Sequence, residues 1–195
     1  MSRTASIRRT TGETDVEVRV DLDGTGVAEA VTGIGFFDHM LVLLARHSLV
    51  DISVTASGDL ETGSHHTVED TGITLGQALD TALGDRSGIE RYGSALVPMD
   101  EVLVQVAMDL SGRPFLAFDA PLPPMVLGGF ETDLVAEFMR GLSNAARMTL
   151  HVDVLKGGGP HHVIEGCFKG VARALRGAVA INPRVSGVPS SKGTL

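Results

Sequence analysis

The sequence has little of several residue types, and each shortage excludes a class of protein. Its 195 residues include one cysteine, so no disulfide can form within the chain, and we expect a reducing compartment, the cytoplasm. There is no tryptophan and one tyrosine, which leaves few aromatic rings on which nucleic-acid bases could stack. The longest apolar run, residues 40–45, is far shorter than the ~20 residues of a membrane span, and residues 1–11 are polar and basic. We therefore expect neither a membrane protein nor a secreted one.

Basic residues are also scarce relative to acidic ones. Sixteen Lys and Arg face 24 Asp and Glu, a net charge of −8, which is the wrong sign for a protein that neutralises nucleic-acid phosphates. The hydrophobic share of 43% and the charged share of 21% are those of an ordinary globular protein. The chain length favours one domain, or two small domains packed closely. We expect no nucleic acid as a partner.

Histidine is the informative residue type, because two of the short segments that contain it match each other. A shift of 96 residues lays 65–69 (HHTVE) over 161–165 (HHVIE) without a gap, and matching apolar positions follow both segments at helical spacing. Both copies are therefore predicted to open a helix. The same shift lays 51–54 over 147–150, two stretches that alternate polar and apolar residues as a half-buried strand does.

The rest of the chain fits a duplicated unit of sheet plus two helices. Residues 15–22 and 96–110 alternate as strands, and each half is predicted to run strands, helix, strand, helix. We expect an α+β fold in which each half covers the apolar face of the other. The expected divisions are two pseudo-repeats, about 1–92 and 93–183, and a C-terminal arm, 184–195.

The HHxxE pattern points to metal binding. Residues three and four apart share a helix face, so the Glu of each motif can approach either His, whereas adjacent His diverge by about 100° and suit two neighbouring ions. Adding His39 and His151 gives six His and two Glu, which divide evenly into two sites of three His and one Glu. Imidazole with carboxylate suits Zn, Mn, Fe or Ni. The expected ligands are His39, His65, His66, Glu69, His151, His161, His162 and Glu165.

Less specific explanations compete with this one. A single His pair near a helix start is more often a surface or capping feature, but two pairs with Glu at the same offset favour metal. His47 lacks such a setting, and we interpret it as structural. Asp100 and Glu101 follow Pro98 and are either proton carriers or solvated strand residues.

Short motifs recur along nearly the whole chain, in segments 13–14, 35–41, 65–70, 98–101, 109–114, 161–165, 168–169 and 189–193. Taken in this order, they resemble the imidazoleglycerol-phosphate dehydratase family. Two positions differ from the usual family pattern, since the family usually has Asn at Gly159 and often an acidic residue where this chain has Gly63-Ser64.

The resemblance implies a duplicated fold like the second domain of ribosomal protein S5. It implies two Mn²⁺ per active site, other divalent ions being possible, and a homo-oligomer of 24 subunits with active sites between subunits. The implied activity is that of a hydro-lyase of L-histidine biosynthesis, converting imidazoleglycerol phosphate, a small phosphorylated imidazole, to imidazole acetol phosphate and water. The proton carriers it suggests are Glu13, which would also hold substrate hydroxyls, Glu69 and Glu165. The phosphate-binding residues it suggests are Arg91, Arg113, Lys169, Ser190, Ser191 and Lys192.

The chemistry of this reaction explains a need for two ions. The proton to be removed lies beside no carbonyl, so an ordinary base alone faces a high barrier. Two ions that each take one ring nitrogen would stabilise an imidazolate intermediate as Lewis acids. Three rival functions use similar ligands: a dinuclear metallohydrolase, a metal-storage or metal-sensing protein, and an assembly protein stapled by metal. Formation of the ketone product would separate them from a dehydratase.

Overall fold

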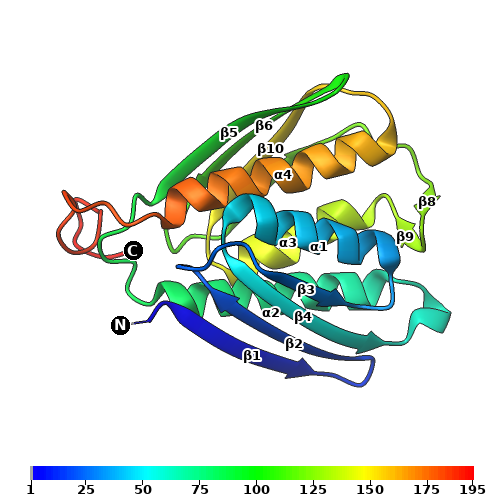
Figure 1. Cartoon of the computed structure of the whole chain (residues 1–195), viewed down its shortest axis with the longest axis horizontal. Helices are drawn as coiled ribbons and strands as arrows, with labels where there is room; N and C mark the ends of the chain where they lie inside the picture. Colours follow the sequence, from blue (N-terminus) through cyan, green and yellow to red (C-terminus); the bar gives the residue numbers. More distant parts are fainter. Residues whose placement is uncertain (1) are drawn as a thin grey trace.

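Two four-stranded sheets form the outer layers of the molecule, and four helices lie between them (Figure 1). The computed structural model describes residues 2–195. The first sheet has the order β1-β2-β4-β3, and the second has the order β5-β6-β10-β7. The elements of the first half are β1 (Thr4–Thr10), β2 (Thr14–Asp21), β3 (Ala28–Val31), α1 (Gly35–Ser48), β4 (Asp51–Gly58), the 3₁₀ turn η1 (Leu60–Thr62) and α2 (His65–Leu83). Those of the second half are β5 (Tyr92–Met99), β6 (Val102–Asp109), β7 (Phe115–Asp119), β8 (Val126–Leu127), β9 (Phe130–Glu131), α3 (Leu134–Ala145), β10 (Thr149–Lys156) and α4 (Pro160–Val179).

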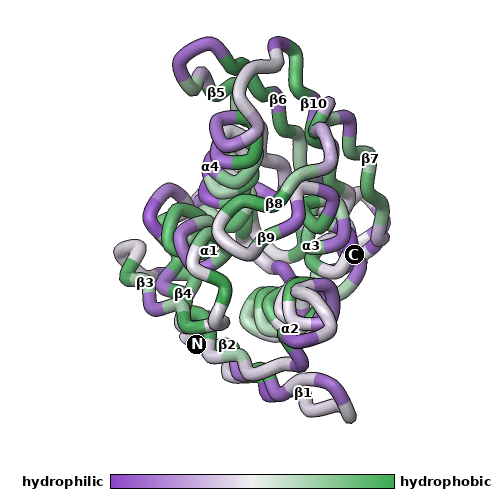
Figure 2. Tube along the Cα trace, turned by 90° about the vertical axis from the view of Figure 1, so that its right-hand side faces the viewer, coloured by the Kyte–Doolittle hydropathy of each residue, from purple (hydrophilic) through white to green (hydrophobic). Residues whose placement is uncertain are grey.

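The core lies on the helix-facing sides of both sheets. Alternate valines of β2 and β6 are buried there, for example Val18 and Val106, while the residues between them face outward. Seen from the side, the apolar stretches of strands and helices meet in the middle of the molecule (Figure 2). The predicted α+β class and the pairing of two sheet-plus-helices halves are confirmed.

Helix pairs join the two halves. α2 covers β1 and β2 and packs against α3, while α4 covers β5 and β6 and packs against α1. Small residues allow the closest of these approaches. A Cβ atom at Gly72 would lie 2.6 Å from the carbonyl oxygen of Phe138, and one at Gly76 would lie 2.7 Å from that of Leu142. No helix within residues 2–195 is long and apolar enough to cross a membrane.

The repeat is real, but its offset changes along the chain. β2 and β6 begin at Thr14 and Val102, 88 residues apart, whereas β4 and β10 begin at Asp51 and Thr149, 98 apart. Strand register agrees, because Val18 pairs with Val54 in the first sheet and Val106 pairs with Val152 in the second. The overlay of 51–54 on 147–150 is therefore wrong by two residues. The two-residue difference arises because the connection from β4 to α2 contains η1 and is longer than the connection from β10 to α4.

Two further expectations about strands need correction. Residues 96–110 are not one strand but parts of two, β5 and β6, which meet at a tight turn at Asp100 and Glu101. Asp100 adopts a positive φ of 49°, which Asp tolerates in turns and which ends the extended run. β1 was not expected, because its alternation lies within a polar, basic stretch at the edge of the sheet.

Candidate metal and substrate site

The two His pairs occupy the first turns of α2 and α4 and have nearly the same geometry. The ring centroids of His65 and His66 lie 5.9 Å apart at 87°, and those of His161 and His162 lie 5.9 Å apart at 86°. The adjacent rings of a pair thus diverge, as a helix requires of neighbouring residues. Divergent rings of this kind suit two neighbouring metal sites better than one.

The first His of each pair faces the Glu one turn later. Nε2 of His65 lies 3.5 Å from Oε2 of Glu69, and Nε2 of His161 lies 3.2 Å from Oε2 of Glu165. Metal bonds of about 2.0–2.2 Å to imidazole and carboxylate set neighbouring ligand atoms about 3.0–3.5 Å apart. Both His–Glu spacings fit two adjacent ligands of one divalent ion.

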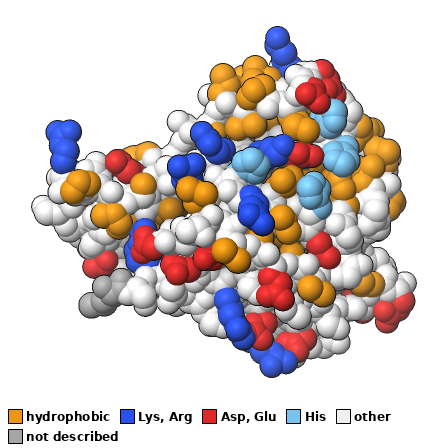
Figure 3. Space-filling view, viewed as in Figure 1, with side chains coloured by type: hydrophobic (Ala, Val, Ile, Leu, Met, Phe, Trp, Pro, Cys, Tyr) orange, Lys and Arg blue, Asp and Glu red, His pale blue; other side chains and the backbone are white. Residues whose placement is uncertain are grey.

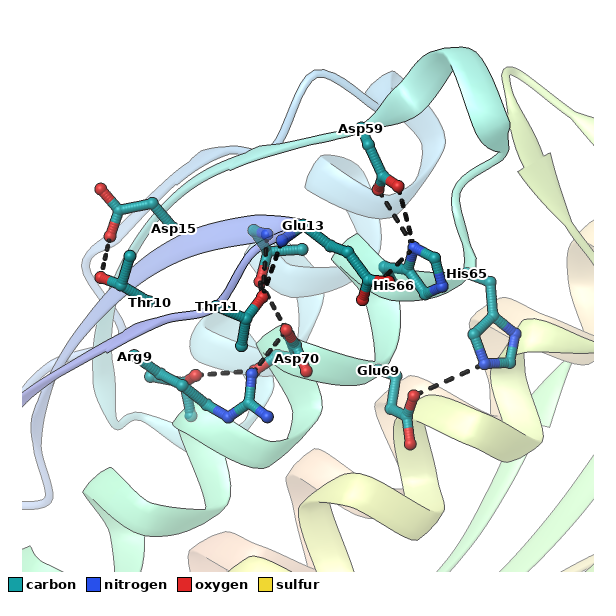
Figure 4. Close-up of polar contacts among 12 residues, drawn as sticks. Arg9, Thr10, Thr11, Glu13, Asp15, Asp59, His65, His66, Glu69 and Asp70 are labelled. Atoms are coloured by element: carbon teal, nitrogen blue, oxygen red, sulfur yellow. Dashed lines mark hydrogen bonds and ion pairs between the residues drawn. The ribbon is translucent and has the colours of Figure 1, made fainter.

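The second His of each pair is hydrogen-bonded through Nδ1 to a carboxylate (Figure 4 shows the first pair). Nδ1 of His66 lies 3.0 and 3.1 Å from the two carboxylate oxygens of Asp59, and Nδ1 of His162 lies 3.0 and 3.3 Å from those of Glu101. Hydrogen bonding to these carboxylates raises the pKa of His66 and of His162. The backbone N–H of Gly159 donates to Glu101 and is the main reason that the pKa of this carboxyl falls to about 2. A carboxylate on Nδ1 is the usual support of a His that binds metal through Nε2.

Glu165 also has a cationic neighbour. Its Oε1 lies 2.5 Å from Nζ of Lys169, and its side chain is 10% exposed. Burial opposes ionisation, but Lys169, His161 and the nearby His39 outweigh it, and the pKa of Glu165 lies below its usual value. The ring of Phe36 at the start of α1 stands 5.1 Å from that of His161. On this side of the molecule histidine side chains gather next to basic ones (Figure 3).

The eight predicted ligands do not all come together among the described residues. Among residues 2–195, the group of His, Asp and Glu ligand atoms that lies within 4.8 Å is Asp100, Glu101 and His162, which includes neither His39 nor His151. His151 is exposed on β10, on the face of the sheet that points away from the helices, and its ring lies 5.6 Å from that of Phe115. The outward direction expected for His151 is confirmed.

The cationic residues suggested for phosphate fall into two groups. Arg91 donates to both oxygens of Asp109 and to the carbonyl of Pro189 in the C-terminal arm, and Arg113 lies 3.7 Å from the same Asp109. Ser190, Ser191 and Lys192 follow Pro189. This group lies beyond the C-terminal end of α4, while the His pair opens its other end (Figure 1). Twenty residues of helix separate the ends by about 30 Å. Of the residues suggested for phosphate, Lys169 is the one that lies near the His pair of α4, beside Glu165.

Sequence reasoning missed two parts of this site. Asp59 stands alone in a loop, seven residues before His66, so no spacing rule connects them. Ser64, at the position where the family often has an acidic residue, donates to the carboxylate of Glu131 from β9 in the other half. His47, interpreted as structural, is half-buried on α1, and burial lowers its pKa.

Comparisons with known proteins agree on one family. The family model described as imidazoleglycerol-phosphate dehydratase matches residues 32–175. A protein of that name from Rhodopseudomonas palustris is 59% identical over 194 residues, covering 99% of this chain and 98% of the relative. The one from Moorella thermoacetica is 55% identical over the whole of both chains.

Solved structures give the same result for the fold. The imidazoleglycerol-phosphate dehydratase of Staphylococcus aureus superposes with a TM-score of 0.83 at 38% identity, covering 92% of this chain and 99% of that one. The structure from Pyrococcus furiosus gives 0.84 at 39% identity, covering 97% and 100%.

Proposed function

The chain belongs to the imidazoleglycerol-phosphate dehydratase family and is therefore a dehydratase of histidine biosynthesis, and on that premise we propose that it works with two divalent metal ions, Mn²⁺ first among them. The two HHxxE motifs supply the central ligands: His65, His66 and Glu69 from α2, and His161, His162 and Glu165 from α4. His39 and His151 complete the sets. A cytoplasmic location belongs to the same proposal, because Cys167 is a free thiol.

One observation carries the metal assignment. Both motifs present a His–Glu pair at ligand spacing, followed by a second His whose Nδ1 is engaged by a carboxylate. A surface or capping role would not require the same arrangement twice, on helices from different halves. Carboxylates behind imidazoles orient the ring and make it a better metal ligand.

Self-association is the second part of the proposal. His151 faces outward on the second sheet, and exposed apolar residues accompany it there, among them Leu96 (60% exposed) and Phe115 (54%). A ligand on such a face can meet an HHxxE motif only if the motif belongs to another copy of the chain. This supports active sites between subunits, as expected for an assembly of 24.

The roles of the protein groups follow from their positions. Bound metal would act as a Lewis acid that stabilises negative charge on the substrate imidazole. Glu13, at the β1–β2 turn, has a 57% exposed side chain next to His66, so it can reach a substrate hydroxyl or carry a proton. Glu69 and Glu165 stand beside metal-binding His and have less freedom for proton transfer.

Phosphate binding is assigned to the cationic groups at the far end of α4. Arg113, with a 66% exposed side chain, and Lys192 in the arm are free to receive a phosphate, while Arg91 is tied to Asp109. Arg91 would thus hold the arm through Pro189 and contribute charge. In an assembly, Lys169 of one chain can complement the arm of another.

Turnover with and without metal tests the proposal directly. Chelated protein should form no imidazole acetol phosphate from imidazoleglycerol phosphate, and added Mn²⁺ should restore ketone absorbance. The particle should also become smaller after chelation, because ligands come from different subunits. Full activity of metal-free protein would refute the metal assignment, and release of inorganic phosphate would favour a metallohydrolase. An unchanged particle size would count against ligands shared between subunits.

A further inference from the structure

We propose that Asp59 and Glu101 are positioning residues that hold the second His of each motif by Nδ1, and that Asp59 thereby leaves Glu13 free for the substrate. The inference rests on the metal-dependent function proposed above. It concerns how residues of this chain present their ligand atoms, and it assigns different tasks to two glutamates that the duplication made equivalent.

Glu13 and Glu101 occupy equivalent positions in the two halves. Each immediately precedes the second strand of a hairpin, β2 or β6, and these strands begin 88 residues apart. Their strand pairings also correspond, with Thr4 opposite Asp21 and Tyr92 opposite Asp109. Both hairpin turns lie beside a His pair, so the duplication brings a Glu to both.

The two glutamates nevertheless make different contacts. Glu101 lies 3.0 Å from Nδ1 of His162, whereas Glu13 lies 3.8 Å from Nδ1 of His66, beyond hydrogen-bonding distance. Asp59 makes the hydrogen bond with that nitrogen instead, and Glu13 lies to one side of the ring, as Figure 4 shows. One half thus uses the hairpin Glu to hold its His, and the other half uses a separate carboxylate.

The longer β4–α2 connection explains the difference. Asp59 begins this connection directly after β4, and the residue that directly follows β10 is Gly157, which has no side chain to offer. Asp59 is steadied by the hydroxyl of Thr62, which donates to it at 2.9 Å. Glu101 is steadied by the N–H of Gly159, also at 2.9 Å. Each holding carboxylate is itself fixed by a second donor, as a positioning group must be.

The chemical effect is the same in both halves. A neutral imidazole that donates Nδ1–H to a carboxylate keeps its lone pair on Nε2, and the ring cannot rotate without losing the bond. Loss of such a partner typically weakens metal binding 10- to 100-fold. Glu13 has no such bond and a 57% exposed carboxylate, so it can meet a substrate.

Mn²⁺ binding by the full-length protein, followed by the EPR signal of free Mn²⁺, tests the positioning role. Glu101→Met keeps the side-chain volume but accepts no hydrogen bond from Nδ1, and we expect a 10- to 100-fold weaker affinity for part of the bound Mn²⁺. Glu101→Gln keeps an acceptor oxygen and should restore the affinity to within about threefold of wild type. Glu137→Gln on α3 is the control, because it also removes one negative charge and Glu137 pairs with Arg140 rather than with a His.

The first half provides a sharper comparison. Asp59→Leu should weaken Mn²⁺ binding less than Glu101→Met does, because Glu13 is near enough to move onto Nδ1 of His66. Asp59→Leu combined with Glu13→Met, which leaves no carboxylate or amide oxygen to accept from Nδ1, should then show the larger loss. Glu61→Gln, an exposed change in the adjacent 3₁₀ turn, is the control and should bind Mn²⁺ as wild type does.

Solid-state ¹⁵N spectra of metal-free, histidine-labelled protein provide a readout independent of metal. Wild type should show protonated Nδ1 signals that decrease in Glu101→Met and return in Glu101→Gln. The inference is overturned if Glu101→Met matches Glu137→Gln in both Mn²⁺ affinity and Nδ1 signals. A wild type that binds no Mn²⁺ and forms no ketone would refute the proposed function instead, and the spectra would still decide how His162 is held.

Discussion

Replacing Asp70 with alanine tests how the hairpin that carries Glu13 is held against the helix that carries the first His pair. Asp70 lies on α2 with a side chain 10% exposed, and its Oδ2 lies 2.5 Å from Nη1 of Arg9 on β1. The hydroxyl of Thr14 on β2 donates to the same oxygen. This one carboxylate therefore ties both strands of the hairpin to α2, and Figure 4 shows its contact with Arg9.

The size of the effect follows from what Asp70→Ala leaves behind. Removing one partner of a buried ion pair costs about 3–5 kcal/mol, because the other charge stays buried. The Arg9 side chain is 31% exposed, so water recovers part of this cost, and we expect about 2–3 kcal/mol. For a chain of this size that lowers the melting temperature by roughly 4–12 °C.

The second half of the molecule shows that the fold itself does not require this charge. The positions equivalent to Arg9, Thr14 and Asp70 are Val97, Val102 and Gly166, and a Cβ at Gly166 would lie 2.9 Å from Val104. The apolar side chains of Val102 and Val104 on β6 lie against α4 there, and no ion pair is present at these equivalent positions. Arg9→Val combined with Asp70→Ala should therefore cost about 1 kcal/mol or less, because neither charge is left unpaired.

Urea unfolding of the metal-free protein, followed by circular dichroism at one fixed protein concentration, measures the loss of stability in both the single and the double variant. The single and double variants give the coupling between Arg9 and Asp70 directly. A loss below about 0.5 kcal/mol for Asp70→Ala would refute the reasoning, since that is the range of an ordinary surface change. So would a double variant whose loss equals the sum of the two single losses.

Three further experiments probe separate parts of the molecule. Glu165→Gln should bind Mn²⁺ at least tenfold more weakly while the circular dichroism spectrum stays that of wild type, and full occupancy by metal analysis would exclude a ligand role; Glu137→Gln on α3 is the control. Lys192→Ala should raise KM roughly 10- to 100-fold, the worth of a charge-assisted contact, with metal content intact. Lys156→Ala is the control and should leave KM unchanged. Equal affinity of the parent protein for phosphorylated and unphosphorylated ligands would reject the phosphate role. Burial raises the pKa of Cys167 to about 12, so little of it is thiolate at pH 8, and the native protein should resist a disulfide reagent that modifies Cys167 once urea unfolds the chain. Rapid modification of folded protein would show that Cys167 is accessible.

Much of the ligand chemistry was accessible from sequence because it is local. In the HHxxE motif, helical geometry alone puts His65 near Glu69 and turns His66 elsewhere, and both relations hold in the structure. The same applies to His151, whose outward direction follows from alternation along a strand. The exact repeat was less accessible, because one gapless shift cannot represent offsets that change with every loop.

Contacts between distant segments needed the tertiary structure. Asp59 reaches His66 across a 3₁₀ turn, and Glu101 reaches His162 from 61 residues away. Neither has a spacing rule, since loop conformation decides where each carboxylate points. The difference between Glu13 and Glu101 is of the same kind.

The sequence by itself predicted the candidate ligands of the HHxxE motifs and the helices on which they stand, because helix and strand periodicity act over a few residues. Only the tertiary structure decided what holds those side chains, and that the two ends of α4 keep the His pair and the arm apart within one chain. The physical reason is distance: a hydrogen bond or a ligand set depends on ångström-scale placement of groups from separate elements, which packing and loop length set together.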